Sequence, residues 1–320
     1  MWRIRHMHLH RFMLMYASIQ RIKPLQMRMA LNSYKLSIKR IRKGLVTMPT
    51  TYAHYKFGKD VMSALPRPLQ QSIDGNRELF DIGLHGPDIF FYYRIFNKNH
   101  VNETGYRMHD EFADIFFKHA AEVIACAEDK SAARAYIYGF ICHFALDSEC
   151  HKYVEKMIQV SGISHSEIEM EFDRKLLTED FINPVTYLAT KHIHPTEKNA
   201  EVIAQFFDGI SAEETKKSLS YMILCHKLLL APKQAKRKTL FCGLKLIGQY
   251  ESIHGMIMSE TPNPACEEYS ELLKKLYAGA VPLAAGLILQ YQKVLFQEAE
   301  LPGRFHETFG AGENWEELRL

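Results

Sequence analysis

Residues 138–155 read YGFICHFALDSECHKYVE, and this stretch shows how the centre of the chain folds. Four polar side chains recur in it at intervals of four residues, namely His143, Asp147, His151 and Glu155. An α-helix advances by about 100° per residue, so each step of four leaves neighbours of the series only about 40° apart. The sequence therefore predicts a helix that carries imidazoles and carboxylates along one face.

Helical periodicity extends over most of the chain. Apolar residues at steps of three and four predict long amphipathic helices over residues 110–127 and 131–160. Ser164 begins another, with Glu167 at the capping-box position. Further helices are expected over residues 197–207, 212–230, 266–277 and 282–298, and alternating strand patterns are nearly absent. The expected fold class is all-α, a single bundle of eight to ten helices.

The composition is that of a soluble globular protein. Of 320 residues, 47% are apolar and 24% are charged, which excludes a disordered or collagen-like chain. The six cysteines form no C-x-x-C pair, which favours free thiols in a reducing compartment over a thiolate zinc knuckle, so we expect a cytoplasmic protein. The longest apolar run, residues 278–289, is about half of what spans a bilayer and contains Pro282, so no transmembrane segment is predicted.

Charge divides the chain in two. Residues 1–47 hold eleven Lys and Arg and no acid, whereas residues 48–320 hold 29 Lys and Arg against 37 acids. We therefore expect one domain over residues 48–320, preceded by a basic leader. Three interpretations of the leader stay open: an organelle transit peptide, a basic arm for nucleic acid or anionic lipid, and a mis-assigned start with translation beginning at Met48.

Further candidate ligands lie on both sides of the central stretch. His165 and Glu169 are again four residues apart, so they can converge on one divalent ion. Upstream, Asp88 lies in LHGPDIFFYY (84–93), His109 in GYRMHDE (105–111) and His54 in TYAHYKFG (51–58). Each also has an ordinary structural interpretation, because surface ion pairs, exposed histidines and a helix N-cap aspartate use the same residue types.

These motifs together resemble the zinc-dependent phospholipase C family, which shares its all-α fold with fungal single-strand nucleases. The resemblance covers residues 48–173 and implies three zinc ions per chain. It implies that the first zinc is bound by Asp88, His109, His143 and Asp147. It implies that the second is bound by His151, His165 and Glu169, and that Asp147 bridges to a third zinc bound also by His54. One departure is clear: in secreted members the bridging Asp and the next ligand His lie six residues apart, whereas Asp147 and His151 are four apart.

The resemblance implies a phosphodiester hydrolase of the phospholipase C type, in which hydroxide formed at zinc attacks phosphorus. Asp88 is then the expected catalytic residue, both binding zinc and orienting the water. His85 and Tyr92 are candidate substrate contacts, although the aromatic run over residues 90–93 also suits core packing. A phosphodiester, including a phospholipid, is the expected substrate, and the acidic body disfavours nucleic acid. Two alternatives stay open: a metal-binding helical protein without hydrolytic activity, and a nuclease-like phosphodiesterase.

Overall fold

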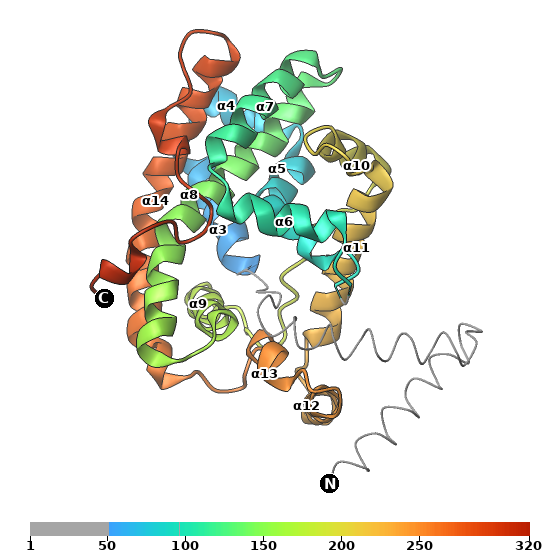
Figure 1. Ribbon diagram of the computed structural model, residues 1–320, viewed down its shortest axis with the longest axis vertical. Helices are drawn as coiled ribbons and strands as arrows, with labels where there is room; N and C mark the ends of the chain where they lie inside the picture. Colours follow the sequence, from blue (N-terminus) through green and yellow to red (C-terminus); the bar gives the residue numbers. More distant parts are fainter. Residues whose placement is uncertain (1–50, 96) are drawn as a thin grey trace, which may run out of the picture.

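The computed structural model describes residues 51–95 and 97–320 (Figure 1). Within these residues it contains twelve α-helices and five short 3-10 helices, and the only β-bridge there is an isolated one between Phe112 and Thr308. The predicted all-α fold is confirmed. The expected number of eight to ten helices is too low, because short helices also form in stretches without long periodic patterns. The predicted leader, residues 1–47, lies outside the described residues.

Most elements follow one another through short connections, and a longer one over residues 180–196 joins α9 to α10. The first half of the described chain contains α3 (Thr51–Ala64), α4 (Arg67–Asp74), α5 (Arg77–Gly83), η1 (Gly86–Tyr92), α6 (His100–Asp110), α7 (Ala113–Cys126) and α8 (Lys130–Ser161). The second half contains α9 (His165–Glu179), α10 (Glu197–Ala204), α11 (Ala212–Leu229), α12 (Gln234–Leu246), α13 (Tyr250–Ile253), η2 (His254–Met256), η3 (Pro264–Cys266), α14 (Glu267–Leu295), η4 (Gly303–Phe305) and η5 (Trp315–Glu317).

Helix α8 is the axis of the bundle. Asp129 caps its start by accepting a hydrogen bond from the backbone N–H of Ala132, and Gly162 ends it in the left-handed conformation that favours glycine. Its 32 residues pack along α14 and α5 and also contact α3, α7 and α9 (Figure 1). The residues from Ala132 to Ser148 are almost all buried, so the face with His143 and Asp147 points into the protein.

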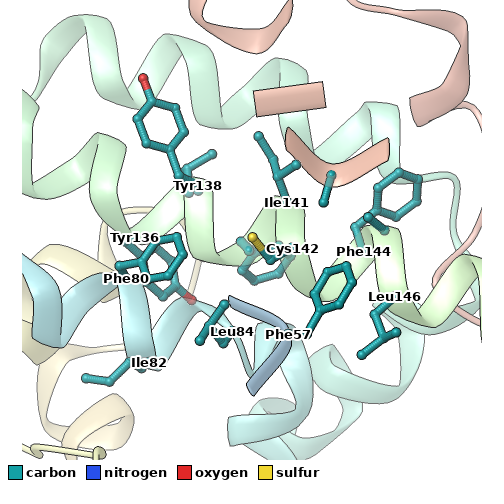
Figure 2. Packing of buried hydrophobic residues seen from close by; sticks show 14 of the residues in the cluster. Phe57, Phe80, Ile82, Leu84, Tyr136, Tyr138, Ile141, Cys142, Phe144 and Leu146 are labelled. Atoms are coloured by element: carbon teal, nitrogen blue, oxygen red, sulfur yellow. The ribbon is translucent and has the colours of Figure 1, made fainter. Parts of the chain in front are cut away.

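Two glycines let α5 approach α8 closely. A Cβ atom at Gly83 would overlap the backbone carbonyl of Tyr136, and one at Gly139 would overlap the carbonyl of Phe80. Large side chains fill the space around this crossing, as Figure 2 shows for Phe80, Ile82 and Leu84 of the α5 segment and Tyr136, Ile141 and Phe144 of α8. The crossing fixes the chain just before η1, which carries Asp88, against the middle of α8.

Helix α14 corrects one prediction. The sequence suggests two helices separated at Pro282, but α14 continues through this proline from Glu267 to Leu295. Pro282 and Ala278, whose carbonyl loses its usual partner, are both exposed, so water can satisfy that carbonyl. By length and composition, the segment Pro264–Leu295 could cross a membrane. In this structure the segment packs against α8, α3 and α9, and 39% of its most apolar window is buried.

Candidate metal centre

A tight turn brings the acid-rich faces of α8 and α9 together. After Gly162 the chain turns, and the hydroxyl of Ser164 accepts a hydrogen bond from the N–H of Glu167 at the start of α9. The predicted helix start at Ser164 is therefore confirmed. Glu169 of α9 comes within reach of both His165 and His151, although these histidines are fourteen residues apart.

The first group of candidate ligands consists of His54, Asp88, His143 and Asp147, all buried, with one ligand atom of each within 4.8 Å of the others. The two oxygens of Asp147 lie 3.1 Å from the Nε2 atoms of His54 and His143 respectively. His109 completes the surroundings, since its Nε2 lies 3.0 Å from Asp88 Oδ1 and 4.0 Å from Asp147 Oδ2. The residues come from α3, η1, α6 and α8.

The second group consists of His151, His165 and Glu169. Glu169 Oε1 lies 3.0 Å from His165 Nε2 and 3.5 Å from His151 Nε2. Glu155 lies on the other side of His165, with its Oε1 3.6 Å from Nδ1. Asp147 Oδ2 also lies 3.8 Å from His151 Nδ1, so one carboxylate stands between the two groups.

The donor atoms suit bound zinc. Zinc–nitrogen bonds of about 2.0–2.1 Å in a tetrahedral arrangement separate neighbouring ligand atoms by about 3.3 Å, close to the spacings found here. Several of these buried atoms have no hydrogen-bond partner among the described residues, namely both oxygens of Asp88, Oδ2 of Asp147, Oε2 of Glu169 and both ring nitrogens of His143. Buried polar atoms without partners are costly, and cations at both groups would satisfy them.

Backbone carbonyls orient two of the imidazoles. The Nδ1–H of His109 donates to the carbonyl of Gly105 over 2.8 Å, and that of His151 donates to the carbonyl of Phe309, also over 2.8 Å. In each ring this directs Nε2 at the acidic side chains, where the neutral ring would present its lone pair to a metal ion. Phe309 belongs to a C-terminal segment that returns over α8, and the N–H of Gly310 donates to the carbonyl of His109.

In the second group, the carboxylate and the two imidazoles shift one another's pKa values. Burial alone would lower the pKa of His151, but the charges of Asp147 and Glu169 outweigh it and raise this pKa to about 10. The pKa of His165 is likewise raised to about 9, chiefly by Glu169 against the effect of burial. Burial would raise the pKa of Glu169, but the two imidazoles hold it at about 2. Without metal, the group is therefore an ionised carboxylate between two imidazolium rings.

The turn before Asp88 requires glycine. Gly86 has φ of +48°, in the left-handed region, and a Cβ atom there would overlap the imidazole of His143. Pro87 follows it, and the short 3-10 helix η1 then turns Asp88 inward, where it is 1% exposed. The motif HGPD thus supports the first group by its backbone as well as by its carboxylate.

The two candidate substrate contacts lie beside the ligand groups. His85 is fully buried, and its Nε2 lies 2.7 Å from Nε2 of His192 in a hydrogen bond between the rings. The Tyr92 hydroxyl lies 3.1 Å from Nε2 of His226. Burial lowers the pKa of His192 to about 3 and that of His226 to about 4, so both rings are neutral. Sequence reasoning missed these partners, because neither histidine has an acid at helical spacing.

Asp173 is a further supporting residue that the sequence did not indicate. Its buried carboxylate on α9 accepts hydrogen bonds from the backbone N–H groups of Tyr52, over 3.1 Å, and Ala53, over 2.8 Å. It thereby caps the start of α3 from another helix. His54 follows immediately on α3, so Asp173 helps to fix that imidazole in the first group.

A comparison with family models supplies the identification. The model described as zinc dependent phospholipase C matches residues 53–221. This chain belongs to the zinc-dependent phospholipase C family. No curated protein and no solved structure matches the chain. The match contains all eight candidate ligands, and the buried His and Asp cluster fits a zinc-binding hydrolase of this family. It ends before α12, α14 and the segment that contains Phe309.

Proposed function

We propose that this protein is a zinc-dependent phosphodiester hydrolase of the phospholipase C type. The observation that carries the proposal is the convergence of two ligand groups on Asp147, one oxygen of which faces His54 while the other faces His143 and His151. A carboxylate shared in this way is suited to holding ions close together. Ions a few ångströms apart are a common means of stabilising both oxygens of a phosphoryl displacement.

The proposed ligand sets follow the resemblance to the family. In the structure the spatial group of Asp88, His143 and Asp147 includes His54, and His109 adjoins it through Asp88. We assign one ion to Asp88, His109, His143 and Asp147, a second to His151, His165 and Glu169, and a third to His54 with Asp147. Bound zinc would lower the pKa of a coordinated water to near 7 and neutralise phosphate oxygens. The three ligand carboxylates contribute three negative charges against six positive ones, so the loaded site attracts a phosphodiester anion.

The protein's own groups then orient the reactants. Both oxygens of Asp88 are buried and have no hydrogen-bond donor in residues 51–95 and 97–320, so this carboxylate can accept a proton from the attacking water and direct the lone pair of that water at phosphorus. His109, held by the Gly105 carbonyl, keeps Asp88 in place from the other side.

Metal analysis combined with hydrolysis of p-nitrophenyl phosphorylcholine tests the proposal. We expect about three zinc ions per chain and hydrolysis that is lost with a chelator and restored by zinc. Asp88→Asn should abolish hydrolysis, whereas the exposed Asp208→Asn should behave as the wild type. Zinc binding without hydrolysis of any phosphodiester would favour the non-catalytic alternative, and no zinc binding after reconstitution would refute both.

A further inference from the structure

The described chain has one strongly basic stretch in an acidic body. Between Glu214 and Glu251 there are eight Lys and Arg and no Asp or Glu, although residues 48–320 as a whole have eight more acids than bases. This stretch forms α11 after its first three residues, the connection that follows, all of α12 and the turn up to Tyr250. Figure 1 shows α12 at the end of the molecule opposite α4 and α7.

Hydrogen bonds hold the end of α11, the connection after it and α12 together, and we call this unit the corner. The Lys236 ammonium donates to the carbonyls of Lys227 and Leu230, over 2.9 and 2.7 Å, and so ties the start of α12 to the end of α11. Arg237 donates to the carbonyls of Ala231 and Met258. These two cations stabilise the fold, which distinguishes them from the lysines that face solvent.

Four other lysines of the corner are exposed, namely Lys227, Lys233, Lys238 and Lys245. No ion pair in the described part of the chain includes any of them, whereas Lys216 and Lys217 pair with Glu197 and Glu213. Glu260, which accepts a hydrogen bond from Gln234, is the acid bound at the start of α12. The corner therefore keeps a net positive charge.

Exposed leucines accompany the lysines. Leu224 and Leu228 lie one turn apart on α11 and are 59% and 56% exposed, and Leu246 at the end of α12 is 62% exposed. Lysines with large exposed aliphatic side chains on a peripheral helix are typical of a surface that rests in the interface of a bilayer. A nucleic-acid surface would use the charges but would gain little from the leucines.

The corner also borders the elements of the metal centre. The residues that line an apolar pocket include Leu229, Leu230 and Ala231 of the corner together with Asp173 and Thr51. Asp173 caps α3, which carries His54. The pocket therefore adjoins both the basic corner and the start of a ligand-bearing helix.

We propose that the corner formed by the end of α11 and by α12 docks the protein on an anionic lipid bilayer. The lysines supply attraction to acidic headgroups, and the leucines enter the interfacial region. The role of this docking rests on the proposed function, since a phospholipid hydrolase must reach its substrate at a membrane surface. The docking itself is independent of hydrolysis and is tested without it.

Vesicle flotation with the full-length chain tests the proposal. We expect binding to vesicles of phosphatidylcholine mixed with phosphatidylserine, weaker binding to phosphatidylcholine alone, and a marked loss at about 0.5 M salt, where charges are screened within about 4 Å. In the variant K233Q/K238Q/K245Q, the loss of three lysines should weaken binding about 100-fold. The matched control K198Q/K275Q/K293Q removes three exposed lysines from other elements and should bind as the wild type does.

Two further measurements separate the explanations. Hydrolysis of the soluble p-nitrophenyl phosphorylcholine should be equal in both triple variants, so a failed docking proposal leaves the proposed function untouched, and the reverse also holds. Leu224→Ala/Leu228→Ala should weaken vesicle binding without changing binding to a DNA duplex. Equal vesicle binding by the two triple variants would overturn the proposal and assign any attraction to residues 1–47. Binding of the full-length protein to DNA but not to vesicles would overturn the proposal as well.

Discussion

Zinc binding to the metal-free protein should release protons, and the number follows from the second ligand group. At pH 8 a histidine with the ordinary pKa of about 6.5 is almost entirely neutral. His151 and His165, with pKa values raised to about 10 and about 9, are each about nine-tenths or more protonated at this pH. Because zinc binds only the neutral imidazole, its binding to this group must displace about two protons.

Titration calorimetry in two buffers of different ionisation enthalpy measures this release. The difference between the observed heats gives the number of protons transferred to the buffer. A water bound to zinc would add to the release at pH 8, so two is the lower bound for the wild type. Because both pKa values are raised, a proton competes with the ion at each histidine. The apparent zinc affinity should therefore increase with pH up to about 9–10.

A single substitution tests whether the charge of Glu169 causes the proton release. Glu169→Gln removes the charge that chiefly raises the pKa of His165 and one of the two that raise the pKa of His151, so proton release should fall by about one per chain. Glu298→Gln, at an exposed position, is the matched control and should leave the release unchanged. Wild-type heats that do not depend on the buffer would show that the imidazoles are neutral before zinc arrives, and would refute the electrostatic account of the site.

Three other perturbations give separate outcomes. Asp147→Ala removes the carboxylate shared by the two groups, so zinc content by mass spectrometry should fall by two ions per chain, while Asp208→Ala should keep the full content. A chain that ends at residue 302 lacks the Phe309 carbonyl and should bind zinc about 10- to 100-fold more weakly in chelator competition, whereas one that ends at residue 312 should bind normally. Gly86→Ala should lower both the melting temperature and the zinc content, because its methyl group would displace a ligand imidazole; wild-type zinc content in this variant would contradict the proposed arrangement.

The strongest sequence patterns predicted the long helices. The four-residue repeat and the apolar period gave α8 to within a few residues, and the serine before His165 gave the start of α9. The failures have local causes. The sequence suggested a break at Pro282, but an exposed proline can be accommodated when the carbonyl that it leaves unpaired faces water. The short helices α4 and α13 have too few turns to establish a period.

The candidate ligands could be predicted because they lie in compact motifs, and the structure brings all eight of them together. The residues that hold these ligands in position could not be predicted from the sequence. Asp173 caps a helix that begins 122 residues earlier in the chain, and Phe309 reaches His151 through a backbone carbonyl, for which the side-chain sequence gives no signal. Contacts of this kind depend on how α3, α9 and the C-terminal segment meet, and that is decided by packing over the whole bundle.

The position of Asp147 makes the two ligand groups interdependent. Burial by itself would raise the pKa of Asp147, but the imidazoles of His143, His151 and His54 hold it well below its ordinary value. An ion that occupies the first group neutralises this carboxylate and weakens its hold on the proton of His151. The second group then binds its own ion with less competition from protons. Zinc binding should therefore be cooperative between the groups, and Asp147→Asn, which keeps the shape but removes the charge, should abolish that cooperativity in a stepwise titration.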